Sequence, residues 1–472
     1  MAPRTTWELV FGRSSRGRRG RLAAGASVRC EPLERRALLS GNGAGSSVLG
    51  TVVDDIGDTY LVGSFKGTVD FDPGPGVVNL TSRGRSDAFL VKLDAAGGLL
   101  WAKSFGSAGD DAARGIALNP LGDDVFVVGS FSGTLVLDPA DPEASLVGAG
   151  RRDGFIASFD SEGNDVWARS FGGSLMDGIN SIAIDLSGTV YVGGEFTGSV
   201  DFDLLHGGTV LTSTGRGGRT DGFVAAYSLL GGCLWARAVG GGKDDAVLGV
   251  ATSPAGLVVA VGEFEQTVDF DPGPGVARRQ SQGDADGFVL ALSRAGEHRW
   301  SFSLGGRDDD AVRAVACDAA GNVFLGGEFE GSVDFDPSSG RTTLRSGGEE
   351  DGFVAKYSAE GAFAWVRGFG SPKEDGIFAL AVDPSGGVVA GGRRAEAVSE
   401  TTWLRGRPQT RIRWREAGYA VKLDDAGRTV WSASFLAAAV GSGSDSHDDD
   451  DDDDDDDREE RRRHCYASVR GD

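Results

Sequence analysis

The sequence reads Val258-Val-Ala-Val-Gly-Glu-Phe264 and, about 65 residues later, Val323-Phe-Leu-Gly-Gly-Glu-Phe329. The same continuation follows each copy, as Thr267-Val-Asp-Phe-Asp-Pro272 and then as Ser332-Val-Asp-Phe-Asp-Pro337. A fixed period of this length is typical of proteins in which one supersecondary unit stacks on copies of itself. The fold of the whole chain can therefore be predicted from this repeat.

Six tryptophans carry the period along the chain. They are Trp101, Trp167, Trp235, Trp300, Trp365 and Trp431. Each unit holds four short segments rich in Val, Phe and Trp, bounded by Asp, Asn and Gly turns, which predicts antiparallel strands. A single four-stranded unit cannot bury both of its faces, so the units must pack side by side around an axis. We predict an all-β fold, a six-bladed β-propeller over residues 46–435, with the tryptophans wedged between blades.

The repeat text carries a family resemblance. Segments such as Asp351-Gly-Phe-Val-Ala-Lys356, together with the Gly-Asn-Val type of second strand, resemble the SBBP-type bacterial β-propeller repeat, a relative of the NHL-like propellers. The resemblance covers residues 46–435. It implies a propeller fold and does not imply a particular ligand.

The two ends of the chain differ from the repeats. Residues 1–45 form a basic leader that contains Glu31-Pro-Leu-Glu-Arg-Arg-Ala-Leu-Leu-Ser40. This stretch resembles the LEPR-XLL motif of exported planctomycete-type proteins, which implies an extracellular or cell-surface location. The alternative is a disordered leader with no role in export. Residues 436–472 are an acidic low-complexity tail with ten consecutive aspartates, and both ends are predicted to be disordered.

Composition restricts the partners. The formal net charge of −23 disfavours binding to nucleic acid, because an acidic surface repels the phosphate backbone. No apolar run is long enough to span a membrane. The four cysteines show neither a disulfide framework nor zinc-site spacing. We therefore expect a monomer that binds a protein or glycan at the cell surface, or a cation.

Aspartates recur at equivalent positions of the repeats. One series precedes the first strand of each unit and is the candidate ligand-binding set: Asp111, Asp177, Asp245, Asp310 and Asp375. A second series lies in the Asp-Phe-Asp-Pro inserts and their variants and is the candidate metal-binding set: Asp72, Asp138, Asp203, Asp271 and Asp336. A third series opens the third strands: Asp87, Asp153, Asp221, Asp286 and Asp351.

Two interpretations of these aspartates remain open. The connections before the first strand and after the second lie at the same end of an up-and-down blade, so the series would share one face. Carboxylates repeated around a mouth could bind Ca²⁺ or a cationic ligand, and calcium is the candidate cofactor. Alternatively, each aspartate accepts backbone N–H bonds and fixes a turn. Recurrence in every unit favours turn fixing, because a ligand site needs one constellation only.

Catalysis has little support in the sequence. We find no catalytic histidine pair, no nucleophile elbow and no His-Glu-x-x-His motif. We therefore predict a non-enzymatic binding or structural module that acts through its acidic loop face, with no catalytic residues. The alternative is a carboxylate-based hydrolase or lyase that cleaves polysaccharide at the propeller mouth.

The sixth unit departs from the pattern. Its insert, residues 393–415, contains seven arginines and lacks both the Glu-Phe and the Asp-Phe-Asp-Pro text. One interpretation is a basic loop that contacts an acidic partner or the neighbouring blade. The other is a locally shifted reading frame that is restored before Tyr419.

Overall fold

The structure is a computed structural model. It describes residues 45–436 except for 139–140, 204, 216 and 405–406. Every regular element in this part of the chain is a β-strand, as predicted. The predicted leader and acidic tail lie almost entirely outside the described residues.

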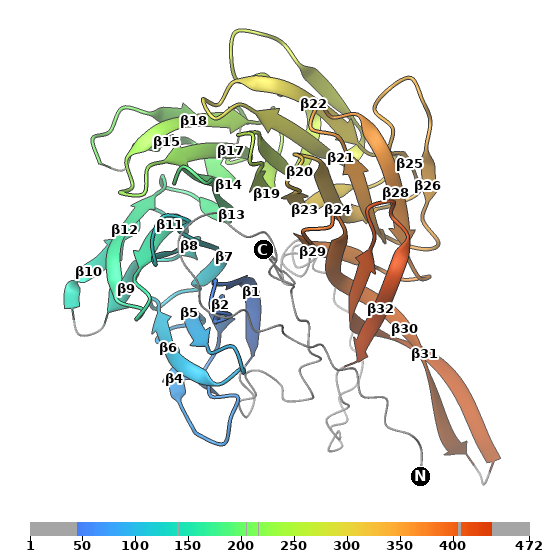
Figure 1. The fold of residues 1–472 in the computed structure, drawn as a ribbon, viewed down its shortest axis with the longest axis horizontal. Coiled ribbons are helices and arrows are strands. Elements are labelled where there is room, and N and C mark those ends of the chain that lie inside the picture. Colours follow the sequence, from blue (N-terminus) through green and yellow to red (C-terminus); the bar gives the residue numbers. More distant parts are fainter. Residues whose placement is uncertain (1–44, 139–140, 204, 216, 405–406, 437–472) are drawn as a thin grey trace, which may run out of the picture.

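Six antiparallel sheets of four strands form the blades (Figure 1). Sheets one and two contain β1 (Ser46–Val53), β2 (Thr59–Phe65), β5 (Asp87–Leu93) and β6 (Leu99–Phe105), then β7 (Ala112–Leu118), β8 (Val125–Phe131), β11 (Asp153–Phe159) and β12 (Asp165–Phe171). Sheets three and four contain β13 (Gly178–Ile184), β14 (Val190–Thr197), β17 (Thr220–Tyr227) and β18 (Cys233–Val239), then β19 (Asp245–Thr252), β20 (Val258–Asp269), β21 (Arg278–Leu292) and β22 (His298–Leu304). Sheets five and six contain β23 (Ala311–Cys317), β24 (Val323–Phe329), β27 (Asp351–Tyr357) and β28 (Phe363–Phe369), then β29 (Gly376–Val382), β30 (Val388–Leu404), β31 (Arg407–Leu423) and β32 (Thr429–Leu436). The predicted six-bladed propeller is confirmed.

The inserts between second and third strands fold back against their own sheets. They form the hairpins β3 (Thr68–Asp70)–β4 (Asn79–Thr81), β9 (Thr134–Asp138)–β10 (Asp141–Val147), β15 (Ser199–Asp201)–β16 (Val210–Thr212) and β25 (Ser332–Asp334)–β26 (Thr343–Arg345), while in sheet four the insert extends β20 and β21. Val69 and Phe71 of the first insert are buried against Phe65 and Phe89. The recurring Val-Asp-Phe text therefore supplies apolar cover in blades one, three, four and five, and Leu135 and Leu137 take its place in blade two.

The fourth-strand tryptophans join neighbouring blades. Trp300 in β22 donates from Nε1 to the carbonyl oxygen of Ala359 in the next blade, at 2.9 Å, and its ring lies over Gly361. Four other tryptophans make the same contact, as described below. The predicted wedge is confirmed at these five joints.

The first strands of successive blades line the axis. β1 packs on β7, and the contacts continue through β13, β19, β23 and β29. Within the described residues, none of the well-packed strand pairs joins sheet one to sheet six, and Figure 1 shows these two sheets on either side of an open sector. Sheets one and six are each built from one contiguous stretch of the chain, so no blade is shared between the two ends of the described residues.

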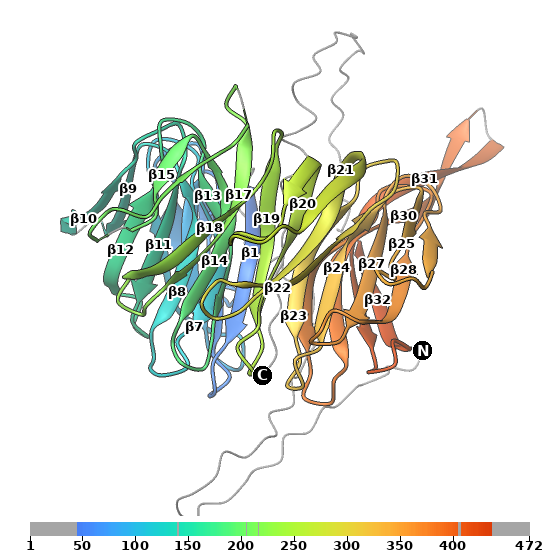
Figure 2. The same cartoon turned by 90° about the horizontal axis from the view of Figure 1, so that it is seen from above.

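The insert of blade six forms a long two-stranded arm. β30 and β31 pair continuously from Val388↔Leu423 to Leu404↔Arg407. Figure 2 shows this hairpin projecting beyond the other blades. The segment that breaks the repeat pattern therefore still forms a regular β-ribbon.

Candidate functional site

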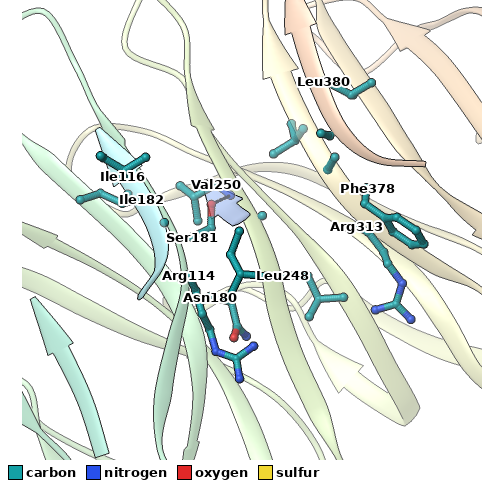
Figure 3. A pocket seen from close by; sticks show the side chains of 16 residues that line it. Arg114, Ile116, Asn180, Ser181, Ile182, Leu248, Val250, Arg313, Phe378 and Leu380 are labelled. Carbon is teal, nitrogen blue, oxygen red and sulfur yellow. Dashed lines mark hydrogen bonds between the residues drawn. The ribbon is translucent and has the colours of Figure 1, made fainter. Parts of the chain in front are cut away.

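A cavity lies where the six first strands meet. Its volume is about 100 Å³, and every blade contributes to its wall, from Leu49 in β1 to Leu380 in β29. Figure 3 shows Arg114, Asn180 and Arg313 among mainly apolar side chains. The Asn180 amide donates to the Val247 carbonyl oxygen at 3.1 Å, which ties adjacent blades together beside the cavity. The centre of this acidic protein is therefore lined by two guanidinium groups.

Arg313 connects the cavity to a cluster of carboxylates. Its Nη2 lies 2.5 Å from Glu328 Oε1 and 3.7 Å from Glu263 Oε2. Glu328 belongs to β24 and Glu263 to β20, so one guanidinium holds carboxylates from adjacent blades. Arg313 is only 12% exposed and Glu328 only 7%, which makes this ion pair far less screened than a surface pair.

Arg393 extends this cluster into blade six. Its Nη2 lies 3.2 Å from Glu374, 3.5 Å from Glu350 and 4.0 Å from Glu328. Its guanidinium also lies 5.6 Å from the centre of the Phe378 ring, which lines the cavity. The base of the arm is therefore anchored on blade five. Arg393, at the start of the basic insert, thus contacts the neighbouring blade, and the two interpretations of the insert both stay open.

This cluster has little capacity for acid–base catalysis. A carboxylate-based glycosidase needs one carboxyl group that holds a proton and a second that is ionised. Glu263 and Glu328 instead share one guanidinium, that of Arg313. The geometry therefore suits fixed charge recognition or blade alignment better than proton transfer.

The first aspartate series is buried at the joints between blades. Asp245 accepts N–H bonds from Gly241 at 2.6 Å and from Glu265 at 3.1 Å, one on each carboxylate oxygen. Asp310 does the same with Gly306 and Glu330. The pattern recurs at Asp111, Asp177 and Asp375, always with the residues four before and about twenty after. Each carboxylate thus fastens the turn between blades to the end of a second strand.

The third series lies beside the first. Asp87, Asp153, Asp221, Asp286 and Asp351 are buried and accept N–H bonds from the segment that precedes them. Burial is the main cause of the raised pKa of Asp245, and the neighbouring charge of Asp221 raises it further. The two series therefore meet as buried carboxyl pairs, as the shared end of the blade predicted.

Burial controls the protonation of these groups. Desolvation raises the pKa of Asp245 and of Asp310 to about 8, against the lowering effect of the two N–H bonds on each. The same cause raises the pKa of Asp177 and of Asp286 to about 6. These joints therefore hold carboxyl groups that titrate far above the usual range of an aspartate.

The second series lies at the opposite end of the blades. The insert hairpins run back along the sheet, so that Tyr227 at the far end of β17 donates its hydroxyl to the carbonyl oxygen of Phe202, next to Asp203. Asp72 and Asp271 each accept an N–H bond from the residue two positions ahead, at 2.7 and 2.8 Å, as turn-forming aspartates do. The structure therefore does not bring the second series together with the first.

Calcium is not expected to change the stability of the protein. Among the residues that the structure describes, no three His, Cys, Asp or Glu side chains form a group able to hold a metal ion. Ca²⁺ needs about 6–8 oxygen ligands, and the first-series oxygens already accept N–H bonds. We predict that millimolar CaCl₂ leaves the melting temperature unchanged in calorimetry. The metal role of the second series stays a prediction, and a rise in melting temperature that is absent with MgCl₂ would support it.

The exposed part of the arm carries a distinct surface. Ile412 and Trp414 of β31 are 67% and 41% exposed and point to one side of the ribbon, because residues two apart share a face. Arg411, Arg413 and Arg415 alternate with them and occupy the other side. An aromatic and an aliphatic side chain next to a row of arginines is a composition typical of protein interfaces.

Sequence reasoning missed the carboxylates of the central cluster. Glu263 and Glu328 occupy the Gly-Glu-Phe text at the end of the second strand, where Glu195 stands in blade three and pairs with Arg152 at 2.7 Å. The signal was available, because Glu occurs at this position in only three units while Ser64, Ser130 and Arg393 replace it elsewhere. A position whose residue type changes between units, as this one does, indicates a local role, whereas the turn-fixing aspartates keep the same residue type.

Comparison with known proteins does not give the chain a family. No protein-family model matches it. The regulatory protein FlaEY of Caulobacter vibrioides is 26% identical over 378 residues, 75% of this chain and 36% of that protein. An uncharacterized WD repeat-containing protein, L264 of Acanthamoeba polyphaga mimivirus, is 31% identical over 184 residues, 37% of this chain and 13% of that protein. The chain thus matches about a third or less of either relative's length.

Solved structures show a general likeness only. Sqt1 from Chaetomium thermophilum is 12% identical with a TM-score of 0.39 and covers 82% of this chain and 83% of that one. Sqt1 bound to the N-terminus of the ribosomal protein L10 is 11% identical with a TM-score of 0.40, with coverage of 82% and 87%. The resemblances to SBBP-type repeats and to the export motif stay predictions. No helix in the described part of the chain has the length and apolar character to cross a membrane.

Proposed function

We propose that this chain is a non-catalytic binding module that recognises a protein partner through the β30–β31 arm. The observation that carries the proposal is the pair of exposed apolar side chains, Ile412 and Trp414, on a ribbon that projects from the body. Tryptophan and arginine are the side chains that most often dominate protein interfaces. The arm combines both.

Charge defines the partner. The arginines of β31 alternate with the apolar side chains and occupy the other side of the ribbon, so a partner that encloses the ribbon meets Trp414 on one side and Arg413 and Arg415 on the other. A partner with an apolar surface for the first side and acidic groups for the second complements this pattern. The anchoring of Arg393 on blade five supports a fixed orientation of the arm, which lowers the entropy lost on binding.

The same proposal includes binding through the acidic loop face of the propeller and export of the protein to the cell surface or beyond. Export rests on the resemblance of residues 31–40 to a planctomycete-type motif. A polysaccharide hydrolase is the weaker candidate, because the carboxylates beside the cavity are held by Arg313.

The test uses the full-length chain and labelled peptides. We expect acidic peptides that contain aliphatic and aromatic residues to bind, measured by fluorescence anisotropy, and basic peptides of the same apolar content not to bind. Trp414→Ala should weaken binding roughly tenfold, which corresponds to about 1.4 kcal/mol. Val166→Ala is the matched control, because Val166 is 55% exposed on β12, away from the arm. Equal binding by the Trp414→Ala variant, or no preference for acidic peptides, would overturn the proposal.

A further inference from the structure

Five joints between blades are built from the same pair of elements. In each, a fourth-strand tryptophan donates from Nε1 to a carbonyl oxygen in the third-to-fourth turn of the next blade. The pairs are Trp101 with Ser161, Trp167 with Leu229, Trp235 with Arg294, Trp300 with Ala359 and Trp365 with Asp425, at 2.7–3.1 Å. Each acceptor stands two residues before a glycine with positive φ.

That glycine is required by the tryptophan. A Cβ atom added at Gly163, Gly231, Gly296, Gly361 or Gly427 would lie 2.6–3.1 Å from a ring atom of the partnering tryptophan. Real Cβ atoms rarely approach other atoms this closely. The joint therefore has two halves, an indole and a turn whose glycine leaves room for it. The indole fits only where the turn has this glycine.

The described part of the chain contains one copy of each half that has no partner there. Trp431, in the fourth strand of blade six, is 37% exposed, and its Nε1 has no acceptor among the described residues. Gly97, in the Asp94-Ala-Ala-Gly97 turn of blade one, has φ of +82° like its counterparts, but nothing lies within 4 Å of a Cβ added there. Ala95 stands at the acceptor position.

The sheet around Trp431 is also uncovered. Lys422 of β31 is 31% exposed, whereas Lys356, at the same position of blade five, is 8% exposed. Val389 is half-buried, whereas its counterpart Phe324 is fully buried by the next blade. Phe435 of β32 is 58% exposed, whereas its counterparts Phe105 and Phe171 are 1% and 4% exposed. A whole sheet face, in addition to one indole, therefore has no neighbour in the described part of the chain.

The two halves do not meet within one chain. Five packed joints fix the position of sheet six relative to sheet one, and Figure 1 shows the open sector between them. Closing that sector would require a change in the joints between blades, which are held by buried apolar contacts and tryptophan hydrogen bonds. A second copy of the chain presents the missing half without any such change.

We propose that copies of this chain associate head to tail, with Trp431 of one copy on the Gly97 turn of the next. This replaces the expected monomer. The contact uses two different surfaces, so it is heterologous and leaves a free half at each end of the assembly. Growth can therefore continue beyond a dimer, with the blade-to-blade joint of the fold repeated between chains.

Two variants of the full-length chain separate the halves. Trp431→Ala removes the indole. Gly97→Asn adds a side chain where the indole must lie, while asparagine tolerates positive φ. In analytical ultracentrifugation the wild-type average mass should rise with concentration. Either variant alone should stay at the monomer mass, because its association constant should be at least tenfold lower than that of the wild type. An equal mixture of the two should stop at a dimer, because only one intact pair of halves remains.

The mixture also controls for misfolding, since a misfolded variant could not restore association. A wild-type chain that stays at the monomer mass at all concentrations would overturn the proposal. That result would mean that another part of the same chain, rather than a second copy, covers Trp431. Association of either single variant as strong as that of the wild type would overturn it too.

Discussion

Replacing Trp300 by alanine should lower the free energy of unfolding by roughly 3–5 kcal/mol. The indole stacks on Phe302 with ring centres 5.6 Å apart and an interplanar angle of 7°, and Phe302 in turn packs on Tyr357. The substitution removes these contacts and the hydrogen bond to Ala359, and it opens a cavity over Gly361. Chemical denaturation followed by circular dichroism measures the change.

Trp431→Ala is the matched control. The residue type and strand position are the same, but Trp431 is 37% exposed and has no blade beyond it. Its loss should change the stability of the monomer by no more than about 0.5 kcal/mol, as for other surface substitutions. Equal losses for the two variants would show that the tryptophans stabilise their own sheets rather than the joints between blades.

The fold could be predicted because the same strands and the same joint residues recur in successive units. The alternation of Val, Phe and Trp in short segments sets the strands, and the period of Trp101 to Trp431 sets the number of blades. Ring closure was not predictable in the same way. Gly97 and Trp431 look like their counterparts in sequence, and only the positions of sheets one and six show that they have no partner.

The candidate site was harder to predict, because the residues that recur most clearly in the sequence are not the residues left free to bind a ligand. The first-series aspartates recur in five units, and the structure shows them buried with both carboxylate oxygens accepting N–H bonds. This supports turn fixing, and their role in ligand binding stays a prediction. The second series was expected on the same face, yet the inserts fold back and bury Phe71 and its counterparts against the sheets, which carries these aspartates to the other end. Hydrophobic covering of the sheet decided the direction of the insert.

Central charge clusters such as Arg313 with Glu263 and Glu328 depend on which side chains cross from one blade to the next. A single sequence gives the position of each residue along its strand but not the offset between adjacent blades. The pairing of Arg393 with Glu350 and Glu374 has the same origin. Contacts between blades therefore had to be seen in three dimensions.

The stability of this protein should fall as the pH rises from about 5 to 9. Burial raises the pKa of Asp245 and of Asp310 to about 8 in the folded chain, whereas an unfolded aspartate titrates near 4. Between these values the folded state binds more protons than the unfolded state, so the free energy of unfolding decreases with increasing pH. The contribution is fully present below about pH 4 and is lost as the pH passes through 8. We expect a loss on the order of a few kcal/mol for the two groups together, measured as melting temperature against pH.

Asp245→Asn isolates one of these groups. The amide has nearly the same shape and no charge to gain, so the variant should lose less stability than the wild type between pH 5 and 9. At pH 5 it should be less stable by roughly 1–3 kcal/mol, because its NH₂ group cannot accept one of the two N–H bonds from Gly241 and Glu265. The two melting curves should therefore converge as the pH rises. A wild-type melting temperature that is constant or rising over this range would show that these carboxylates are ionised throughout and are stabilised by their N–H donors more than burial opposes them.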